Sequence, residues 1–166
     1  KISIVMNCYN GEEYLREAIE SIYSQTYSDW EIIFWDNAST DNSSNIAKSY
    51  DERIKYYLAP KTTPLGEARN LALSYTSGEY VAFLDCDDIW ISDKLAIQVG
   101  LLELNRSYQM CYSGVIFIDE RGNFIRKTLP KSCNSNVFDI QLKSYEIGMQ
   151  SVLIRNNIKI DFNKEL

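Results

Sequence analysis

The chain has no histidine, and this absence excludes several kinds of active site. Histidine is the commonest general base, the middle member of the Ser-His-Asp triad and a frequent zinc ligand. Acid or base chemistry must therefore come from carboxylates, Lys, Tyr or Cys. The C-x-x-C spacing is missing too, and the 4 cysteines lie far apart, at Cys8, Cys86, Cys111 and Cys133. Such isolated thiols are typical of a reduced, cytosolic protein rather than of a disulfide framework.

Long apolar runs and an excess of basic residues are also missing. No stretch approaches the ~20 apolar residues of a transmembrane helix, and we expect no signal peptide before the first apolar segment. The net charge of -6 argues against a nucleic acid partner, because a phosphate backbone selects basic surfaces. Arg126, Lys127 and Lys131 are compatible with a peripheral contact at the inner face of a membrane, although a solvated loop is the simpler interpretation. We therefore expect a cytoplasmic protein.

The first two thirds of the sequence alternate between strand and helix patterns. Apolar, strand-like segments occupy residues 2–6, 30–35, 53–58 and 79–84, and a helix pattern or a helix-capping signal follows each of them. Parallel strands joined by helices form a sheet that is covered on both faces. The 166 residues therefore predict one α/β domain with a doubly wound, mostly parallel central sheet and flanking helices.

The last third departs from this alternation. Residues 109–118 predict one long strand, residues 119–123 carry a hairpin turn signal, and residues 124–128 predict the return strand. A short helix at 138–145 and a last strand at 150–154 follow. The sequence therefore predicts a β-hairpin in the C-terminal third.

Polar side chains follow three of the predicted strands at the point where each strand ends. Tyr9-Asn10 comes after the first, Asp36-Asn37 after the second, and Asp85-Cys86-Asp87-Asp88 after the fourth. Ligands of an open parallel sheet bind beyond the carboxyl ends of its strands. We therefore expect these three clusters to share one rim of the sheet.

The Asp85-Cys86-Asp87-Asp88 cluster predicts a metal site. Its three carboxylates repel one another unless a cation lies among them. Alternate residues of extended backbone point the same way, so Asp85 and Asp87 could share one ion. Oxygen ligands together with substrate phosphates suit Mg²⁺ or Mn²⁺. The competing interpretation is a polar turn with a helix cap. Cys86 should be a poor nucleophile, because the neighbouring carboxylates raise the pKa of its thiol.

Asp36 and Arg69 are further candidate binding residues. Asp36 could accept a hydrogen bond from a ribose hydroxyl or a base N–H, but an ordinary strand-end turn explains it equally well. The glycine-rich phosphate loops G-x-G-x-x-G and G-x-x-x-x-G-K-[ST] do not occur. A metal helped by Arg69 would then have to carry the charge of a diphosphate, unless Arg69 forms a surface pair with Glu67 or Asp85.

Taken together, these residues resemble the family-two glycosyltransferases of the GT-A fold. The resemblance is carried, in order, by Ile2–Asn10, Ser21–Tyr27, Trp30–Ser43, Gly66–Asn70 with its G-E-A-R-N, and Phe83–Asp88 with its F-L-D-C-D-D. The match is strong over residues 1–105, the nucleotide-sugar-binding half of a single domain spanning 1–166. Residues 106–166 match loosely and begin the acceptor-side half.

The resemblance implies an inverting transfer of a sugar from a nucleotide-diphospho-sugar, with a UDP-sugar as the expected donor. It implies Mn²⁺ or Mg²⁺ as the cofactor, a saccharide or lipid-linked acceptor, and a role in surface polysaccharide or glycolipid synthesis. Tyr9, Asn10 and Asp36 would hold the nucleoside, Arg69 would lie by the diphosphate or base, and Asp85 and Asp87 would bind the metal or its water. We expect the acceptor to contact Trp90 and residues 148–150.

Two departures from the family pattern are visible. Asn37 stands where the family often has a second acid, which affects the contacts to the nucleoside. The family's general base lies in an acidic pair after a segment that Phe162–Leu166 resembles, so we expect the base beyond Leu166 and a domain truncated there. Two alternatives stay open. One is a nucleotidyltransferase, which usually carries a Gly-rich, Lys- or Arg-bearing loop after the first strand, and the other is a non-catalytic sugar-nucleotide-binding module.

Overall fold

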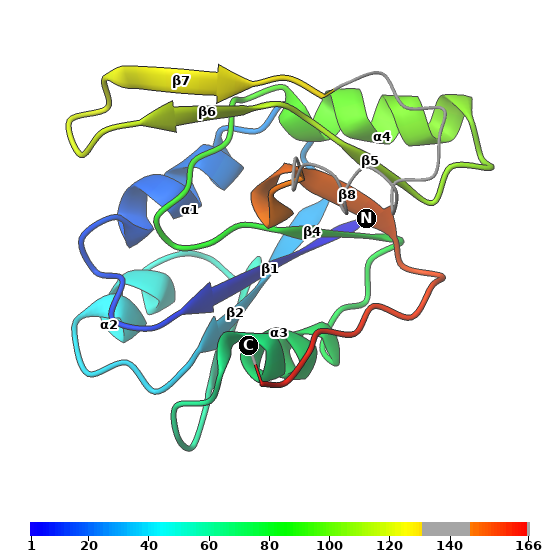
Figure 1. Ribbon diagram of the computed structural model, residues 1–166. Helices are drawn as coiled ribbons and strands as arrows, with labels where there is room; N and C mark the ends of the chain where they lie inside the picture. Colours follow the sequence, from blue (N-terminus) through cyan, green and yellow to red (C-terminus); the bar gives the residue numbers. More distant parts are fainter. Residues whose placement is uncertain (131–146, 166) are drawn as a thin grey trace.

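The computed structural model describes residues 1–130 and 147–165 of the chain (Figure 1). Its N-terminal part alternates strand and helix, as the sequence predicts. These elements are β1 (Ile2–Cys8), α1 (Leu15–Tyr23), β2 (Trp30–Asp36), α2 (Ser43–Lys48), β3 (Ile54–Leu58), α3 (Leu65–Leu73), β4 (Tyr80–Phe83) and α4 (Lys94–Leu104). After α4 come β5 (Met110–Tyr112), β6 (Val115–Ile118), β7 (Phe124–Thr128), the 3-10 helix η1 (Met149–Ser151) and β8 (Val152–Arg155).

The main sheet has the strand order β3-β2-β1-β4-β8-β5. Strands β1 to β4 are parallel, whereas β8 runs antiparallel to both β4 and β5. The chain winds outward from β1 to β3 and then crosses back, so that β4 lies on the other side of β1. This reversal confirms the doubly wound prediction, and it puts the switch point between the carboxyl ends of β1 and β4.

Helices cover both faces of the sheet because the strands bury both sets of alternating side chains. All residues of β1 and β2 are buried. Ile4 and Met6 of β1 belong to an apolar cluster with α1, α2 and α4. Val5 belongs to a second cluster with Ala68 and Ala72 of α3. Figure 1 accordingly shows α3 across the sheet from α1 and α4.

The prediction of one long strand over residues 109–118 is wrong. The segment forms two strands, β5 in the main sheet and β6 in a two-stranded sheet with β7. The chain changes sheets at Ser113, whose N–H donates to the carbonyl of Ser151 (3.1 Å). A Cβ on Gly114 would lie 2.6 Å from the carbonyl oxygen of Thr128, so this close approach requires a glycine. The predicted β-hairpin itself is confirmed, and the helix predicted at 138–145 lies outside the described residues.

The sequence also suggests N-cap residues at Ser39-Thr40-Asp41 before α2 and at Ser92 and Asp93 before α4, and the structure confirms this only in part. Helix α2 begins at Ser43, and neither Asn42 before it nor Asp93 before α4 makes a side-chain capping hydrogen bond. Asp41 accepts hydrogen bonds from the N–H of Ser43, the first residue of α2 (3.0 Å), and from the N–H of Glu12 in the loop after β1 (2.9 Å). In the part of the chain that is described, no helix is long and apolar enough to span a bilayer.

Candidate functional site

The loops after β1 and β2 are joined by reciprocal hydrogen bonds. The N–H of Asn10 donates to the Oγ of Ser39 (3.1 Å), and the Oδ1 of Asn10 accepts from the N–H of Thr40 (2.8 Å). The N–H of Gly11 donates to the Oγ of Ser43 (3.0 Å). Asn10 has a φ of 51°, a left-handed conformation that Asn tolerates better than most residues. The side chain of Asn10 therefore holds the two loops in one fixed arrangement at the rim.

Asp36, at the end of β2, lies beneath this rim. Its side chain is fully buried, with a relative exposure of 0%. Its Oδ1 accepts from the N–H of Ser39 (2.7 Å), and its Oδ2 accepts from the hydroxyl of Tyr56 on β3 (2.5 Å). Burial, and then the hydrogen bond to Asp36, raise the pKa of Tyr56 to about 12, so the hydroxyl stays a donor. Tyr9, in contrast, is exposed at the end of β1.

Asn37 joins the loop after β3 to the same rim. Its Oδ1 accepts from the N–H of Thr63 (3.1 Å), and its Nδ2 donates to the carbonyl of Thr63 (2.8 Å). Its own N–H donates to the carbonyl of Cys8 (2.8 Å). An ionised Asp could accept but not donate, so this reciprocal pair requires an amide. The Asn37 found in place of an acid therefore anchors a loop.

Arg69 of α3 reaches the loop after β4. Its Nη2 lies 3.0 Å from both carboxylate oxygens of Asp85, which decides between the two partners that the sequence left open. The Arg69 side chain is 13% exposed and that of Asp85 36%. The guanidinium also lies 5.5 Å from the centre of the Phe162 ring. Two hydrogen bonds of 2.8 Å between Asn70 and the backbone of Phe162 hold this ring against α3.

Asp87 is exposed, and Asp88 is half-buried next to it. Burial, followed by the charges of Asp85 and Asp87, raises the pKa of Asp88 to about 6. In the described ranges, no three acidic or cysteine side chains are grouped so that they could hold a metal ion. The residues still fit Mg²⁺ or Mn²⁺, because such ions are often held by one or two carboxylates and completed by substrate phosphates and water. Asp87 is the better placed ligand, since Asp85 is already paired with Arg69.

Two thiols lie directly below this rim. A Cβ on Gly11 would lie 2.7 Å from the Sγ of Cys86 and 3.0 Å from the Sγ of Cys8, so the glycine lets the loop after β1 pass over both sulfurs. The hydrogen bond from Cys86 lowers the pKa of Cys8 to about 7. The same contact, burial and the adjacent carboxylates raise the pKa of Cys86, which agrees with the expectation of an unreactive thiol there.

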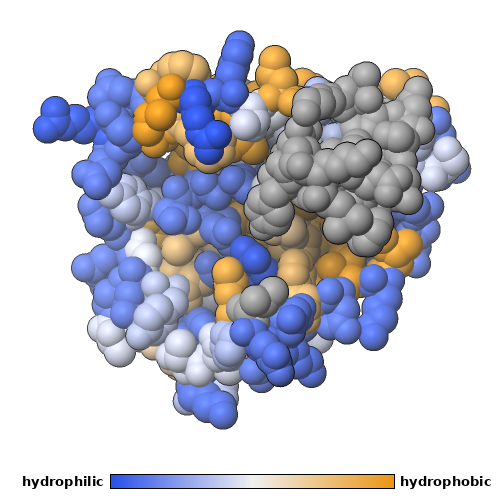
Figure 2. Space-filling view, in the orientation of Figure 1, coloured by the Kyte–Doolittle hydropathy of each residue, from blue (hydrophilic) through white to orange (hydrophobic). Residues whose placement is uncertain are grey.

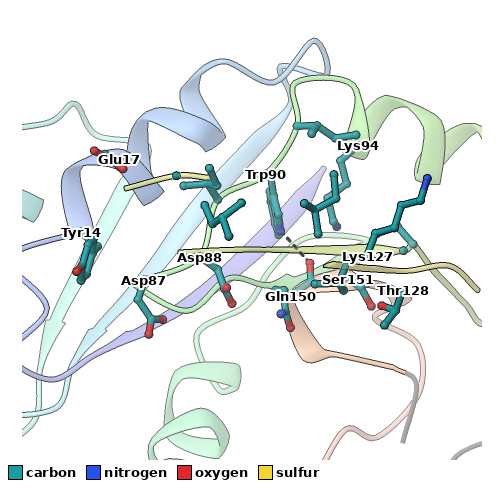
Figure 3. Close-up of a pocket in the computed structure, with 18 of the residues that line it drawn as sticks. Tyr14, Glu17, Asp87, Asp88, Trp90, Lys94, Lys127, Thr128, Gln150 and Ser151 are labelled. Carbon is teal, nitrogen blue, oxygen red and sulfur yellow. Dashed lines mark hydrogen bonds between the residues drawn. The ribbon is translucent and has the colours of Figure 1, made fainter. Parts of the chain in front are cut away.

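A cavity of about 1010 Å³ adjoins Asp87 and Asp88 (Figure 3). Trp90 lines it as a largely buried wall, and its Nε1 donates to the carbonyl of Gln150 (2.8 Å). Lys94 lies behind Trp90, with its Nζ 4.1 Å from the centre of one of the Trp90 rings. Both Trp90 and Gln150, which we expect at the acceptor, therefore line the cavity.

Sequence reasoning missed two residues of this region. Tyr56, which binds Asp36, has no sequence signal other than its place on an apolar strand. Lys94 is buried although it opens a helix, where a Lys is normally solvated; its Nζ donates to Gln98 (2.6 Å). The sequence of α4, which is mostly apolar with Lys94 at its start, could not have shown this, because burial of the Lys94 ammonium depends on Trp90.

The arrangement can hold two ligands side by side. The rim over the switch point combines an exposed carboxylate, the Arg69–Asp85 pair and the exposed Tyr9. Such a set suits a polar, anionic ligand with a bound cation. The neighbouring cavity has mostly apolar walls with carboxylates at one end, which suits a second, less polar ligand.

Comparison with known proteins gives a consistent result. A family model described as "Glycosyl transferase family 2" matches residues 3–162. The putative glycosyltransferase EpsE of Bacillus subtilis is 40% identical over 134 residues, which cover 78% of this chain and 48% of EpsE. The UDP-Glc:alpha-D-GlcNAc-diphosphoundecaprenol beta-1,3-glucosyltransferase WfgD of Escherichia coli is 32% identical over 163 residues, which cover 98% of this chain and 63% of WfgD. The chain thus spans about half to two thirds of these relatives' lengths.

A solved structure shares the fold of about two thirds of this chain. The crystal structure of S. aureus TarS 1-349 in complex with UDP-GlcNAc has a TM-score of 0.62 and 27% sequence identity, and it covers 64% of this chain and 32% of that chain. The mostly parallel sheet with flanking helices is therefore that of the GT-A glycosyltransferases.

Proposed function

Because this chain belongs to glycosyl transferase family 2, we propose that it holds a nucleotide-diphospho-sugar at the rim between β1 and β4 and takes part in transferring the sugar to an acceptor hydroxyl. The observation that carries this proposal is the juxtaposition of the exposed Asp87 with the Arg69–Asp85 pair. A divalent cation held by a carboxylate and an Arg side chain are both favourable partners for a diphosphate. By its name, WfgD acts on a saccharide linked to diphosphoundecaprenol, and we propose a role in polysaccharide or glycolipid synthesis for the whole protein.

The donor is proposed to be a UDP-sugar. WfgD uses UDP-Glc by its name, and TarS has been crystallised with UDP-GlcNAc. We propose that Tyr9 and Asn10 flank the nucleoside, that Arg69 faces the diphosphate, and that Asp87, with Asp85 beside it, binds Mn²⁺ or Mg²⁺. Such an ion would neutralise the charge that develops on the leaving diphosphate.

Asp36 is proposed to act at the nucleoside end of the donor. Direct contact with a base would require the Tyr56 hydroxyl or the Ser39 loop to move, because both oxygens of Asp36 are engaged and buried. Asp36 therefore positions the loop that carries Ser39, and it binds the base itself only if the Tyr56 hydroxyl moves away from its carboxylate.

The acceptor is proposed to be a saccharide or a lipid-linked saccharide, bound in the cavity next to Asp87 and Asp88. Its hydroxyl would attack the anomeric carbon from the face opposite the diphosphate, which inverts that carbon. A carboxylate would remove the proton. Asp161 and Glu165 are poor candidates for this base, because their segment packs against α3 through Phe162, whereas the cavity lies on the side of α1 and α4. We propose that the protein acts in the cytoplasm, at the inner face of the membrane.

A ligand panel tests the proposal. The melting temperature of the chain would be measured with UDP-, GDP-, dTDP- and CMP-sugars, each with and without Mn²⁺. Ligand binding to the folded state adds roughly 2.7 kcal/mol of stability at a hundredfold excess over Kd. We expect a rise with UDP-sugars that depends on Mn²⁺. No shift with any nucleotide-sugar in the presence of Mn²⁺ would overturn the proposal.

A further inference from the structure

The β6–β7 hairpin presents an apolar surface to solvent. The relative exposures of Phe124, Ile125 and Leu129 are 64%, 59% and 67%, and Ile116 is 58% exposed. The hairpin forms its own two-stranded sheet, and it lies across the top of the molecule in Figure 1. Figure 2 shows orange and blue groups next to each other in this region. A two-stranded hairpin is marginally stable in water, and several large apolar side chains exposed on one hairpin indicate an interaction site.

Cations accompany the apolar side chains of this hairpin. Arg126 pairs with Phe117 across the strands, and its guanidinium lies 3.9 Å from the centre of that ring. Lys127 pairs with Ile116. Successive strand residues point to opposite faces, so each face of the hairpin carries one cation beside a large apolar group. Residues 115–129 contain three cations against two acids, a net charge of +1 in a chain whose net charge is -6.

The hairpin also forms one wall of the cavity that reaches the carboxylates. Ile116, Ile118 and Leu129 line this cavity together with Asp87 and Asp88. In Figure 3, Lys127 and Thr128 lie at one end and the two aspartates toward the other, with Trp90 and Gln150 between them. A ligand that enters along the hairpin would therefore reach the rim without leaving the cavity.

We propose that the β6–β7 hairpin docks on an anionic lipid bilayer. Aromatic and aliphatic side chains mixed with Arg and Lys are the composition of interfacial membrane-binding elements, in which apolar groups enter the head-group region and cations lie near lipid phosphates. Docked in this way, the hairpin opens the cavity toward the bilayer, from which a lipid-linked acceptor enters. This last step rests on the proposed transferase function, whereas the bilayer contact does not.

Vesicle sedimentation tests the docking surface. The chain would be mixed with vesicles of phosphatidylcholine alone or with about a third phosphatidylglycerol, at low and high salt. We expect binding to the anionic vesicles that weakens with salt, because screening shortens the reach of charges. Arg126→Gln and Lys127→Gln should each lower the partition coefficient about fivefold. Phe124→Ser with Ile125→Ser should lower it at least as much. Leu71→Ser, an exposed leucine of α3, should leave it unchanged.

Three further results decide the interpretation. Sedimentation that is equal for the native chain and all three hairpin variants would overturn the proposal. A dimer in solution that Phe124→Ser with Ile125→Ser abolishes, without any vesicle binding, would also overturn it, because a second copy would then cover the hairpin. Calorimetric binding of a UDP-sugar with Mn²⁺ is the separate readout for the transferase function, and the hairpin variants should retain it. Vesicle binding without donor binding would reject the proposed function and leave the docking surface standing.

Discussion

The Nη2 of Arg69 lies 3.0 Å from each of the two carboxylate oxygens of Asp85, so a single nitrogen of this α3 side chain contacts both oxygens of the acid that follows β4. The pair crosses the switch point of the sheet from one covering helix to the end of the central strand. It also compensates one of the three clustered carboxylates before any ligand arrives. Under the proposed function, Arg69 would shift between Asp85 and an incoming diphosphate.

Arg69→Met should weaken the binding of a nucleotide-diphospho-sugar with little loss of stability. A hydrogen bond to a charged group contributes about 1.5–3 kcal/mol, which corresponds to at least a tenfold higher Kd. The partly exposed ion pair itself should contribute at most about 1 kcal/mol to folding. Calorimetry and urea unfolding measure the two effects. Arg53→Met is the matched control, because Arg53 is paired with Asp51 at the opposite end of β3. Equal losses of affinity in both variants would remove Arg69 from the site.

Asp87→Asn should abolish the dependence of donor binding on Mn²⁺. The amide keeps the shape of the side chain but loses the charge that a hard cation prefers. Without ligand, the variant should be as stable as the native chain or more stable, because the charge of Asp87 contributes to the raised pKa of Asp88. Asp93→Asn changes an exposed acid that caps no helix and serves as the control. Calorimetry with and without Mn²⁺ reads the result, and unchanged metal dependence in Asp87→Asn would contradict the assignment.

Asp36→Asn and Tyr56→Phe together separate two roles of Asp36. If Asp36 positions the loop after β2, both changes should weaken UDP and UDP-sugar binding about equally, since each loses part of one buried hydrogen-bond network. The loss of binding free energy should be on the order of 1–3 kcal/mol in each variant. If Asp36 binds the base directly, Tyr56→Phe frees one of its oxygens, and affinity should hold or rise. A loss confined to the sugar-bearing ligand would place Asp36 at the wrong end of the donor.

The sequence was sufficient for the main architecture because β1 and β2 are apolar at nearly every position and the helices between strands have one apolar face. Those local patterns specify parallel strands and covering helices. The split of residues 109–118 into two strands could not be predicted in this way. Both halves are apolar and strand-like, and the break depends on the approach of Gly114 to Thr128, which follows from the tertiary fold.

The candidate site was predictable to the same extent. The rule that ligands bind at strand ends selected Tyr9, Asp36 and Asp85, and the structure brings the ends of their strands together. The sequence could not show that Asp36 is buried, because that depends on Tyr56 from another strand. The sequence could not show either that Asp41 divides its carboxylate between Ser43 at the start of α2 and Glu12 in a distant loop. Polar side chains have several possible partners, and only the assembled fold selects among them.

Lys94→Met should change how stability varies with pH. Burial lowers the pKa of Lys94 to about 7, whereas an unfolded Lys titrates near about 10.4. Above pH 7 the unfolded state therefore binds more protons, so this group makes the free energy of unfolding increase with pH. Below pH 7 the native chain must bury the ammonium beside Trp90 and Gln98. Lys94→Met should be the more stable form at pH 6.5.

That advantage should shrink between pH 7 and 8.5 by up to about 1.4 kcal/mol per pH unit. Urea unfolding of both forms at several pH values measures this difference in unfolding free energy. Taking the difference cancels the contributions of the other titrating groups. Cys111, the thiol that interacts with Lys94, stays neutral in this range because burial raises its pKa to about 11. Lys159→Met, at an exposed lysine, should show no such trend. A difference independent of pH would mean that the buried Lys94 keeps its ordinary pKa.

Gly11→Ala should destabilise the loop after β1, which packs on the thiols of Cys8 and Cys86. The added Cβ would lie 2.7 Å from the Sγ of Cys86, which is closer than such atoms approach, and 3.0 Å from that of Cys8, which is a tight contact. Displacing Gly11 would also lengthen its hydrogen bond to Ser43 and shift the loop that bears Tyr9. We expect a loss of about 1–3 kcal/mol in unfolding free energy and weaker donor binding. Cys86→Ala in the same chain should restore part of both, because it removes the nearest sulfur.

The control for this change is Gly100→Ala. Gly100 is exposed in α4, and a Cβ there would have no atom within 4 Å. Alanine is favoured over glycine inside a helix by roughly 0.5–1 kcal/mol, so this variant should gain stability and leave donor affinity unchanged. The two glycine substitutions should thus have opposite signs in urea unfolding. If Gly11→Ala is neutral, the loop after β1 adjusts without cost, and the close contact of Gly11 with the two thiols does not hold the nucleoside rim in place.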